Sequence, residues 1–200
     1  MSAEAPTARL SKASRREQLL DSAAEVLLQR GPGGITMEGL AQQAGVSKAL
    51  PYVHFDNAGS VLVELYQREM QNLGERVAAA LASQIEPSAR LRAAIHAYFD
   101  VVLERGAILA MLAGPGSSIP VLADSGERLG NRFVAAIFRR EFGVPEEAAM
   151  INAALLLGAL NGGIDALTHG EGSRRAIEET VVELALGLTR AHEDAGAAER

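Results

Sequence analysis

The sequence predicts an all-α protein of about nine helices. Three observations support this fold class. Apolar residues recur at every third or fourth position, no segment shows the alternation that is typical of strands, and glycine and proline separate the helical segments. The composition, 48% hydrophobic and 22% charged over 200 residues, suits one or two small helical domains. The absence of cysteine excludes disulfides, thiol catalysis and thiolate metal sites.

The first expected helix runs from Ser14 to Gly31. Ser14 and Glu17 form a capping-box pattern at its start, and the sequence GPGG ends it. Its buried face is expected to consist of Leu19, Leu20, Ala23, Val26 and Leu27. Residues 1–13 are expected to be disordered. Basic residues near the helix start either form a solvated tail or contact DNA phosphates and the minor groove; they are Arg9, Lys12, Arg15 and Arg16.

Residues 36–55 have the pattern of two short helices joined by a tight turn. Thr36 is expected to cap the first helix, and Gly45 ends it because glycine adopts the left-handed conformation at little cost. Ser47 is expected to cap the second helix, which continues to about residue 54. This is the pattern of a helix-turn-helix, whose second helix enters the DNA major groove. An ordinary helical hairpin has the same local pattern.

Residues 14–55 resemble the N-terminal domain of the TetR/AcrR transcriptional regulators. The resemblance is carried by Leu19, Leu20, Ala24, Gly31, Thr36, Leu40, Ala41, Ala44, Gly45, Val46, Ser47, Tyr52, His54 and Phe55. It implies a three-helix DNA-binding domain followed by a helical domain for effector binding and dimerisation. Beyond residue 55 the resemblance is one of length and helix pattern.

Three residues depart from the usual pattern of that family. Ala49 replaces a glycine, Pro51 replaces a leucine, and Ala58 replaces a lysine that often contacts phosphate. Pro51 falls in the first turn of its helix, where its missing N–H costs least. These departures affect how the second helix would read DNA.

The residues expected to face the groove are Lys48, Leu50, Pro51 and Val53. The last three offer no hydrogen bonds, so base reading would depend on thymine methyl groups and DNA shape. The resemblance implies phosphate contacts from Thr36, Tyr52 and His54, and Ser47 at the helix start is included among the DNA-binding residues. Core packing is the alternative for Tyr52.

The net charge is −6, which by itself does not favour nucleic-acid binding. Its distribution is uneven, however. Residues 1–60 hold six basic and six acidic side chains, whereas the other 13 basic and 19 acidic side chains follow. An acidic C-terminal part would be repelled by DNA and would orient the N-terminal part toward it.

The predicted domains are a DNA-binding domain over residues 14–59, an effector-binding and dimerisation domain over residues 60–192, and a frayed tail over residues 193–200. Proline and glycine breaks divide the second domain into helices. Ser88 is expected to cap one of them and Gly106 to interrupt it. The expected helices are 60–83, 89–105, 106–113, 121–142, 146–169 and 174–192.

The last two helices are expected to pair with their copies in a homodimer. The 4-3-4 spacing of one apolar stripe suits helix packing, and glycines on the preceding helix allow close backbone approach. The alternative is that both stripes face their own core. The resemblance implies a four-helix bundle, here with Gly158, Gly162, Ile177, Val181, Leu184 and Leu188 at the interface.

A small-molecule effector, largely apolar, is expected to bind among the helices after residue 88. About 140 residues follow the DNA-binding segment, which is more than dimerisation needs. Apolar lining is expected from Phe99, Leu103, Met111, Leu112 and Phe133, and polar contacts from His96, Asn131, Asn161 and Asp165. Asn161, Asp165 and His169 share one helical face, which could instead lie at an interface or in solvent.

No cofactor, metal or catalytic site is expected. No histidine pair has metal-ligand spacing, and the sequence GPGSS lacks the nucleophile and phosphate-loop patterns. No apolar run long enough for a membrane span and no signal peptide are seen, which predicts a cytoplasmic location. The sequence therefore predicts a DNA-binding transcriptional regulator. The family resemblance implies, by default, a repressor that a small-molecule ligand releases from a palindromic operator. A helical adaptor without a DNA role is the alternative, and an enzyme is a more distant one.

Overall fold

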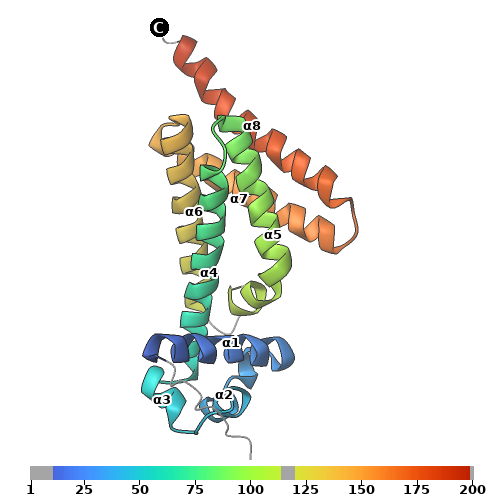
Figure 1. The fold of residues 1–200 in the computed structure, drawn as a ribbon. Helices are drawn as coiled ribbons and strands as arrows, with labels where there is room; N and C mark the ends of the chain where they lie inside the picture. Colours follow the sequence, from blue (N-terminus) through green and yellow to red (C-terminus); the bar gives the residue numbers. More distant parts are fainter. Residues whose placement is uncertain (1–10, 114–119, 199–200) are drawn as a thin grey trace, which may run out of the picture. The chain divides into compact units, whose positions relative to one another are not determined.

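The computed structural model describes residues 11–113 and 120–198, and within them every regular element is helical. This confirms the all-α prediction. In Figure 1 the helices follow the chain from blue to red. Their bounds are α1 Lys12–Arg30, the 3-10 helix η1 Pro32–Gly34, α2 Met37–Gln43, α3 Leu50–His54, α4 Ala58–Ala82, α5 Pro87–Ala113, α6 Pro120–Phe142, α7 Glu146–Thr168 and α8 Arg174–Ala198. The chain divides into two compact units, Met1–Arg68 and Glu69–Arg200.

The first helix begins earlier than predicted. Ser11, rather than Ser14, is the N-cap of α1, because its hydroxyl accepts a hydrogen bond of 3.0 Å from the Ser14 amide. The expected end is confirmed at Gly31, which has a φ of 70°. Lys12 therefore lies in the helix rather than in an arm, and Arg9 lies outside the described residues.

The starts of α4 and α5 also differ from the predictions. Asn57 precedes α4 and exchanges two hydrogen bonds with Ser60, from the Ser60 amide to Asn57 Oδ1 (3.0 Å) and from the Asn57 amide to Ser60 Oγ (3.2 Å). At the start of α5, the Glu86 carboxylate accepts from the Ala89 amide at 2.9 Å. Glu86 thus takes the capping role predicted for Ser88, since its carboxylate also suits the positive end of the helix dipole.

α5 is one continuous helix, and the predicted interruption at Gly106 is wrong. A glycine inside a helix costs only about 1 kcal/mol relative to alanine. Beyond it, Ile108 and Leu112 are buried, with 2% and 0% of their surfaces exposed. Their burial exceeds the cost of the glycine, so the described residues contain eight α-helices rather than about nine. The loop predicted at residues 114–119 lies outside the described residues.

The core of the unit Met1–Arg68 is built around α1. The predicted buried face of this helix is confirmed, because Leu19, Leu20, Ala23, Val26 and Leu27 are all at most 3% exposed. Side chains from α2, α4 and the connecting segments complete this core, namely Ile35, Met37, Leu40, Ala41, Phe55, Val61, Leu62, Leu65 and Tyr66. The short helices α2 and α3 therefore depend on tertiary packing rather than on their own length.

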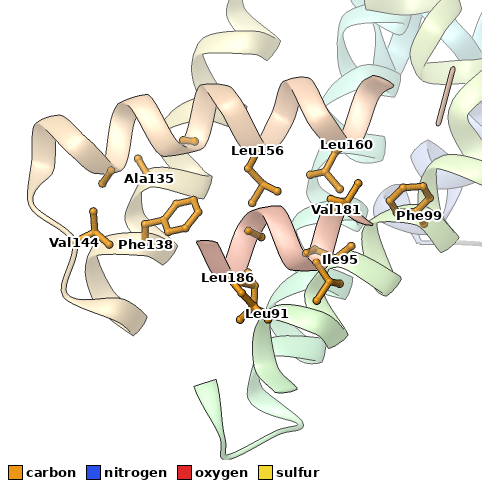
Figure 2. Close-up of a cluster of buried hydrophobic side chains, with 14 residues drawn as sticks. Leu91, Ile95, Phe99, Ala135, Phe138, Val144, Leu156, Leu160, Val181 and Leu186 are labelled. Atoms are coloured by element: carbon orange, nitrogen blue, oxygen red, sulfur yellow. The ribbon is translucent and has the colours of Figure 1, made fainter. Parts of the chain in front are cut away.

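The core of the unit Glu69–Arg200 joins α5, α6, α7 and α8. Figure 2 shows Leu156 and Leu160 of α7 pointing toward α8, with Val181 of α8 beside Leu160 and Leu186 of α8 beside Leu91 of α5. Ile177 and Leu188 also pack against this cluster. Three of the residues predicted at a dimer interface, Ile177, Val181 and Leu188, thus face their own core, since a stripe at this spacing suits an internal partner helix equally well.

Gly163 is placed where a larger residue would collide with its neighbours. A Cβ atom at this position would lie 2.9 Å from Ile177 Cγ2 and 3.1 Å from Phe99 Cζ. We expect Gly163→Ala to lower the free energy of unfolding by about 1–3 kcal/mol, measured by urea denaturation, because added volume strains a packed core. Gly74→Ala is the matched control, with nothing within 4 Å of its Cβ. It should instead raise helix stability, and equal effects of both substitutions would contradict this packing.

α7 presents a large apolar surface outside this core. By length and composition α7 could cross a membrane, contrary to the sequence-based expectation. Only 22% of its most apolar 18-residue stretch is buried. Met150, Ile151 and Leu155 are 40%, 57% and 53% exposed. Its other face packs in the cluster of Figure 2. Exposed apolar side chains on one helix are available for contact with another apolar surface.

Candidate nucleic-acid interface

The turn between α2 and α3 has the expected geometry. The Thr36 hydroxyl accepts a hydrogen bond of 2.9 Å from the Gly39 amide and so caps α2. Gly45 has a φ of 64°, the left-handed conformation that ends the helix. The Val46 amide donates to the Ala41 carbonyl at 3.0 Å, which closes the turn. Both the Thr36 cap and the Gly45 stop are confirmed.

α3 begins at Leu50, later than predicted. A helix capped at Ser47 would need the amide of residue 51 to donate to the Ser47 carbonyl, and Pro51 has no N–H. The Leu50 amide donates to that carbonyl instead, at 3.0 Å, and residues 48–49 form a turn. The N-cap is Ala49, which makes no side-chain cap bond. The departure at Pro51 thus shortens the second helix to five residues.

Exposure separates the predicted DNA-binding residues into two groups. Thr36, Ser47, Lys48, Tyr52 and Val53 are exposed, with 59% of Tyr52 and 63% of Val53 accessible. The core alternative for Tyr52 is therefore excluded. An exposed phenol and an exposed valine on one short helix can approach phosphate and thymine methyl groups, respectively.

The second group is less accessible. Leu50 is half-buried and Pro51 is buried, so we remove Pro51 from the residues expected to face the groove. Its ring lies inward because consecutive positions of a helix point about 100° apart, and Tyr52 and Val53 take the outer face. His54 is only 9% exposed, which limits its expected phosphate contact to the small part of the ring at the surface. Phe55 is in the core.

Lys48 carries a positive charge at this surface, with 78% of its side chain exposed. Its ammonium lies 3.0 Å from Glu38 Oε1 on α2, and that carboxylate is itself 68% exposed. An exposed pair of this kind contributes little to stability. Lys48 can therefore exchange the Glu38 carboxylate for a DNA phosphate without a large loss of free energy. Glu38 itself places a negative charge on the same surface.

The His54 ring is held neutral by its surroundings. Burial of the ring lowers its pKa below the ordinary value of 6.5, and the positive charges of Arg16, Lys12 and Arg15 lower it further. Its Nδ1 atom is buried without a hydrogen-bond partner. Protonation would place a further positive charge inside this cationic environment.

We expect the N-terminal unit to lose stability as the pH falls below 6.5. The unfolded chain then binds a proton that the folded His54 does not, so unfolding becomes more favourable down to the lowered folded-state pKa. His54→Gln should flatten the stability profile below pH 6.5, measured by urea denaturation at each pH. A wild-type profile that is already flat over this range would contradict the lowered pKa.

Arg15 and Arg16 lie within α1, and their side chains are engaged. Arg15 Nη1 donates to Gln18 Oε1 at 2.5 Å. Arg16 bonds Glu64 and the His54 carbonyl. The sequence identified Arg16 only as a basic residue near a helix start, since its partners are 38 and 48 positions away along the chain. Charge patterning within a helix could not reveal either contact.

The residues predicted to contact an effector do not share one environment. Phe99 and Leu112 are fully buried, whereas Leu103 and Phe133 are each 42% exposed. Met111 is half-buried. The side chains that line a ligand pocket surround one concave space. Here two of the predicted side chains are fully buried in the core and two are exposed on the surface. The effector-binding residues therefore stay a prediction.

The polar members of that set are also separate. His96 Nδ1 lies 2.6 Å from Glu178 Oε2. Asn161 is exposed and accepts from the Tyr98 hydroxyl at 3.0 Å. Asp165 is exposed and lies 3.4 Å from His169, which fits the alternative that this face is solvated or interfacial. Asn131 differs, because its Oδ1 is buried without a partner.

Comparison with known proteins identifies the N-terminal segment. Residues 19–65 match the model of the bacterial regulatory proteins of the tetR family. The chain is similar to the HTH-type transcriptional activator FasR of Mycolicibacterium smegmatis, with 39% identity over 94 residues, 47% of this chain and 43% of that protein. It is also similar to the HTH-type transcriptional regulator BetI of Agrobacterium fabrum, with 32% identity over 86 residues, 43% of this chain and 42% of that protein. The chain thus matches less than half the length of these relatives.

Solved structures extend the likeness to the whole fold. A TetR-family transcriptional regulator from Streptomyces coelicolor has a TM-score of 0.70 and 23% identity, covering 94% of this chain and 87% of that one. The fatty acid degradation regulator FadR from Bacillus halodurans has a TM-score of 0.66 and 16% identity, covering 88% of this chain and 97% of that one. At these identities the likeness concerns the fold alone. It covers both the helix-turn-helix and the helices that follow.

Proposed function

Because this chain is a member of the TetR family of bacterial regulatory proteins, we propose that it is a transcriptional regulator that binds double-stranded DNA through α3. The observation that carries this proposal is the exposed surface formed by Lys48, Tyr52 and Val53 beside the capped start of α2. The Thr36 hydroxyl accepts from Gly39 and can still donate to a phosphate oxygen. Such a regulator acts in the cytoplasm, where its DNA lies.

We further propose that the regulator is a homodimer formed through the exposed face of α7. Met150, Ile151 and Leu155 supply apolar area, and Gly158 and Gly162 lie on the same helix with nothing within 4 Å of their Cβ positions. Glycines without neighbours on an apolar helix allow a partner helix to approach closely. On α8, Leu184 is 43% exposed and is a further apolar side chain available to a partner subunit.

A dimer with two copies of α3 is expected to read an inverted repeat. Release by a small-molecule effector bound in the unit Glu69–Arg200 is the regulatory part of the proposal. By linkage, an effector that weakens operator binding must itself bind more weakly in the presence of operator, by the same factor. Calorimetry with and without operator measures both affinities, and equal values would exclude release by that compound.

Lys48→Ala is expected to weaken DNA binding and to reduce its salt dependence. Each lysine that neutralises a phosphate adds about one to the slope of log affinity against log salt concentration. The slope should therefore fall by about one for each subunit that engages DNA. Fluorescence anisotropy over a salt titration measures this change, and an unaltered slope would remove Lys48 from the interface.

Glu38→Gln is the matched control for Lys48→Ala, because it breaks the same ion pair from the other side. It removes a negative charge from the DNA-facing surface and leaves Lys48 available. DNA affinity should therefore rise rather than fall. A fall in both variants would mean that the ion pair, and not the charge of Lys48, supports binding.

The proposed function is tested by footprinting the DNA upstream of the gene that encodes this chain. The expected result is protection of two half-sites related by an inverted repeat, with Lys48→Ala requiring a higher protein concentration for the same protection. Protection of a sequence without a repeat would contradict the symmetric dimer. A chain that protects no site there and binds all duplexes equally would contradict a role as a sequence-specific regulator.

A further inference from the structure

Arg16 joins three helices at the C-terminal end of α3. Its Nε donates to Glu64 Oε2 at 2.8 Å, and its Nη2 lies 2.5 Å from both carboxylate oxygens of Glu64 on α4. Its Nη1 donates to the His54 carbonyl, the last of α3, at 2.8 Å. The guanidinium carbon lies 4.8 Å from the centroid of the Phe55 ring. The Arg16 side chain of α1 thus contacts both α3, the proposed recognition helix, and α4.

The contact between Arg16 and the His54 carbonyl stabilises the C-terminal end of α3. The last carbonyls of a helix have no partner inside it and form the negative end of its dipole, so a cation there is favourable. α3 has only five residues and no side-chain cap at its start. A helix this short is not stable by itself. External bonds at its end, together with the buried Pro51, therefore determine where Tyr52 and Val53 are held.

The same geometry argues against a direct role of Arg16 on DNA. All three guanidinium nitrogens already donate within the protein, and the planar fork of arginine meets the Glu64 carboxylate at two points. A phosphate contact would require Arg16 to give up a part-buried pair. Lys48, with 78% of its side chain exposed, has no comparable constraint.

We infer that Arg16 is a positioning residue for the recognition helix, and that its pair with Glu64 links the position of α4 to that of α3. This inference rests on the proposed DNA-binding function of α3. A displacement of the first turns of α4 would carry Glu64 away from Arg16 or pull Arg16 from the His54 carbonyl. In the first case Arg16 loses the carboxylate that orients its guanidinium, and in the second the end of α3 loses its hydrogen bond from Arg16.

The first test measures DNA binding of Arg16→Gln and Glu64→Gln, with Lys48→Ala as the standard for a phosphate contact. The probes are the duplex protected in the footprint and a mixed-sequence duplex of the same length. Both glutamine variants should lose about 2- to 30-fold in affinity for the protected duplex, the range of effects typical of residues that act indirectly. Their salt slopes and their affinities for the mixed-sequence duplex should stay at the wild-type values.

Arg68→Gln is the matched control for the loss of a cation between α1 and α4. Arg68 lies 2.8 Å from Asp21 and 3.4 Å from Glu17, both on α1, so it joins the same two helices as the Arg16–Glu64 pair. Its removal should leave discrimination between the two duplexes unchanged. A loss of discrimination as large as in Arg16→Gln would show general loosening of the unit and would overturn the inference.

Two other binding results would also overturn it. A salt slope that falls by about one in Arg16→Gln, together with weaker binding to the mixed-sequence duplex, would make Arg16 a phosphate contact. Unchanged affinity of Arg16→Gln for the protected duplex would show that α3 needs no support from Arg16.

Arg16→Lys keeps the positive charge without the planar guanidinium and should recover only part of the affinity that Arg16→Gln loses.

A second measurement needs no DNA and so separates this inference from the proposed function. Amide hydrogen exchange of residues 53–55 in the free protein, followed by NMR, reports the opening of α3. The Phe55 amide donates to the Pro51 carbonyl at 2.9 Å, so its exchange is a direct probe. Exchange should accelerate in Arg16→Gln and Glu64→Gln but not in Lys48→Ala. Equal exchange in all of them would contradict a positioning role even if the chain binds its operator.

Discussion

Replacement of Arg105 by methionine is expected to lower the free energy of unfolding of the unit Glu69–Arg200 by about 3 kcal/mol. Glu69 is 3% exposed and accepts from Arg105 at two points, Nε to Oε2 at 2.9 Å and Nη2 to Oε1 at 2.7 Å. The substitution keeps most of the apolar stem but removes the fork. The buried Glu69 carboxylate then loses two hydrogen bonds from a positive charge. This is the largest loss of stability that we expect from removing a single charge.

The expected loss lies at the lower end of the range for buried pairs because Arg105 is 34% exposed and water reaches one side of it. Arg76→Met is the matched control, since Arg76 joins the same two helices through Glu104 in an exposed pair at 2.6 Å. Urea denaturation should show a large shift of the midpoint for Arg105→Met and a small one for Arg76→Met. Similar shifts would contradict the importance of burial at Glu69.

Replacement of Leu155 by glutamate is expected to convert the proposed dimer into monomers. The side chain is 53% exposed on the apolar face of α7, and two copies of a buried carboxylate at a symmetric interface would lack compensating cations. Sedimentation velocity measures the change directly. Loss of the second recognition helix should also reduce operator affinity by about a hundredfold or more, because the two half-sites no longer bind as one unit.

Leu129→Glu provides the control for that experiment. Leu129 is 60% exposed on α6, outside the proposed interface, so the same substitution should leave the dimer and its operator affinity unchanged. If Leu155→Glu stays dimeric while Leu129→Glu becomes monomeric, the interface lies on α6 instead. A wild-type chain that is monomeric at all concentrations would exclude the dimer itself.

The sequence was sufficient to predict most helices because their signals are local. Gly31, Gly45 and the turn at Gly143 all adopt positive φ, and each lies where glycine ends a helical pattern. Gly106 has the same identity but lies inside α5, because the buried side chains beyond it outweigh its low propensity. Single-residue breaks are therefore reliable only where no apolar face continues past them.

The candidate site was predicted less completely, for two physical reasons. Exposure on a short helix depends on where the helix begins, and Pro51 moved that start by removing one amide bond. Long-range contacts such as Arg16 to Glu64 leave no trace in local spacing. Likewise, the spacing of Ile177, Val181 and Leu188 could not reveal whether the stripe meets its own core or a partner, and packing against α7 decided it.

The most direct test of DNA recognition by α3 is selection of genomic DNA fragments by the purified wild-type chain, followed by sequencing. A parallel selection uses the double variant Lys48→Ala, Tyr52→Ala. We predict that the wild type enriches a small set of fragments sharing one inverted repeat, and that the double variant enriches none of them. Enrichment of the same repeat by both chains would contradict recognition by the exposed face of α3, and enrichment of no shared sequence by the wild type would contradict specific DNA binding.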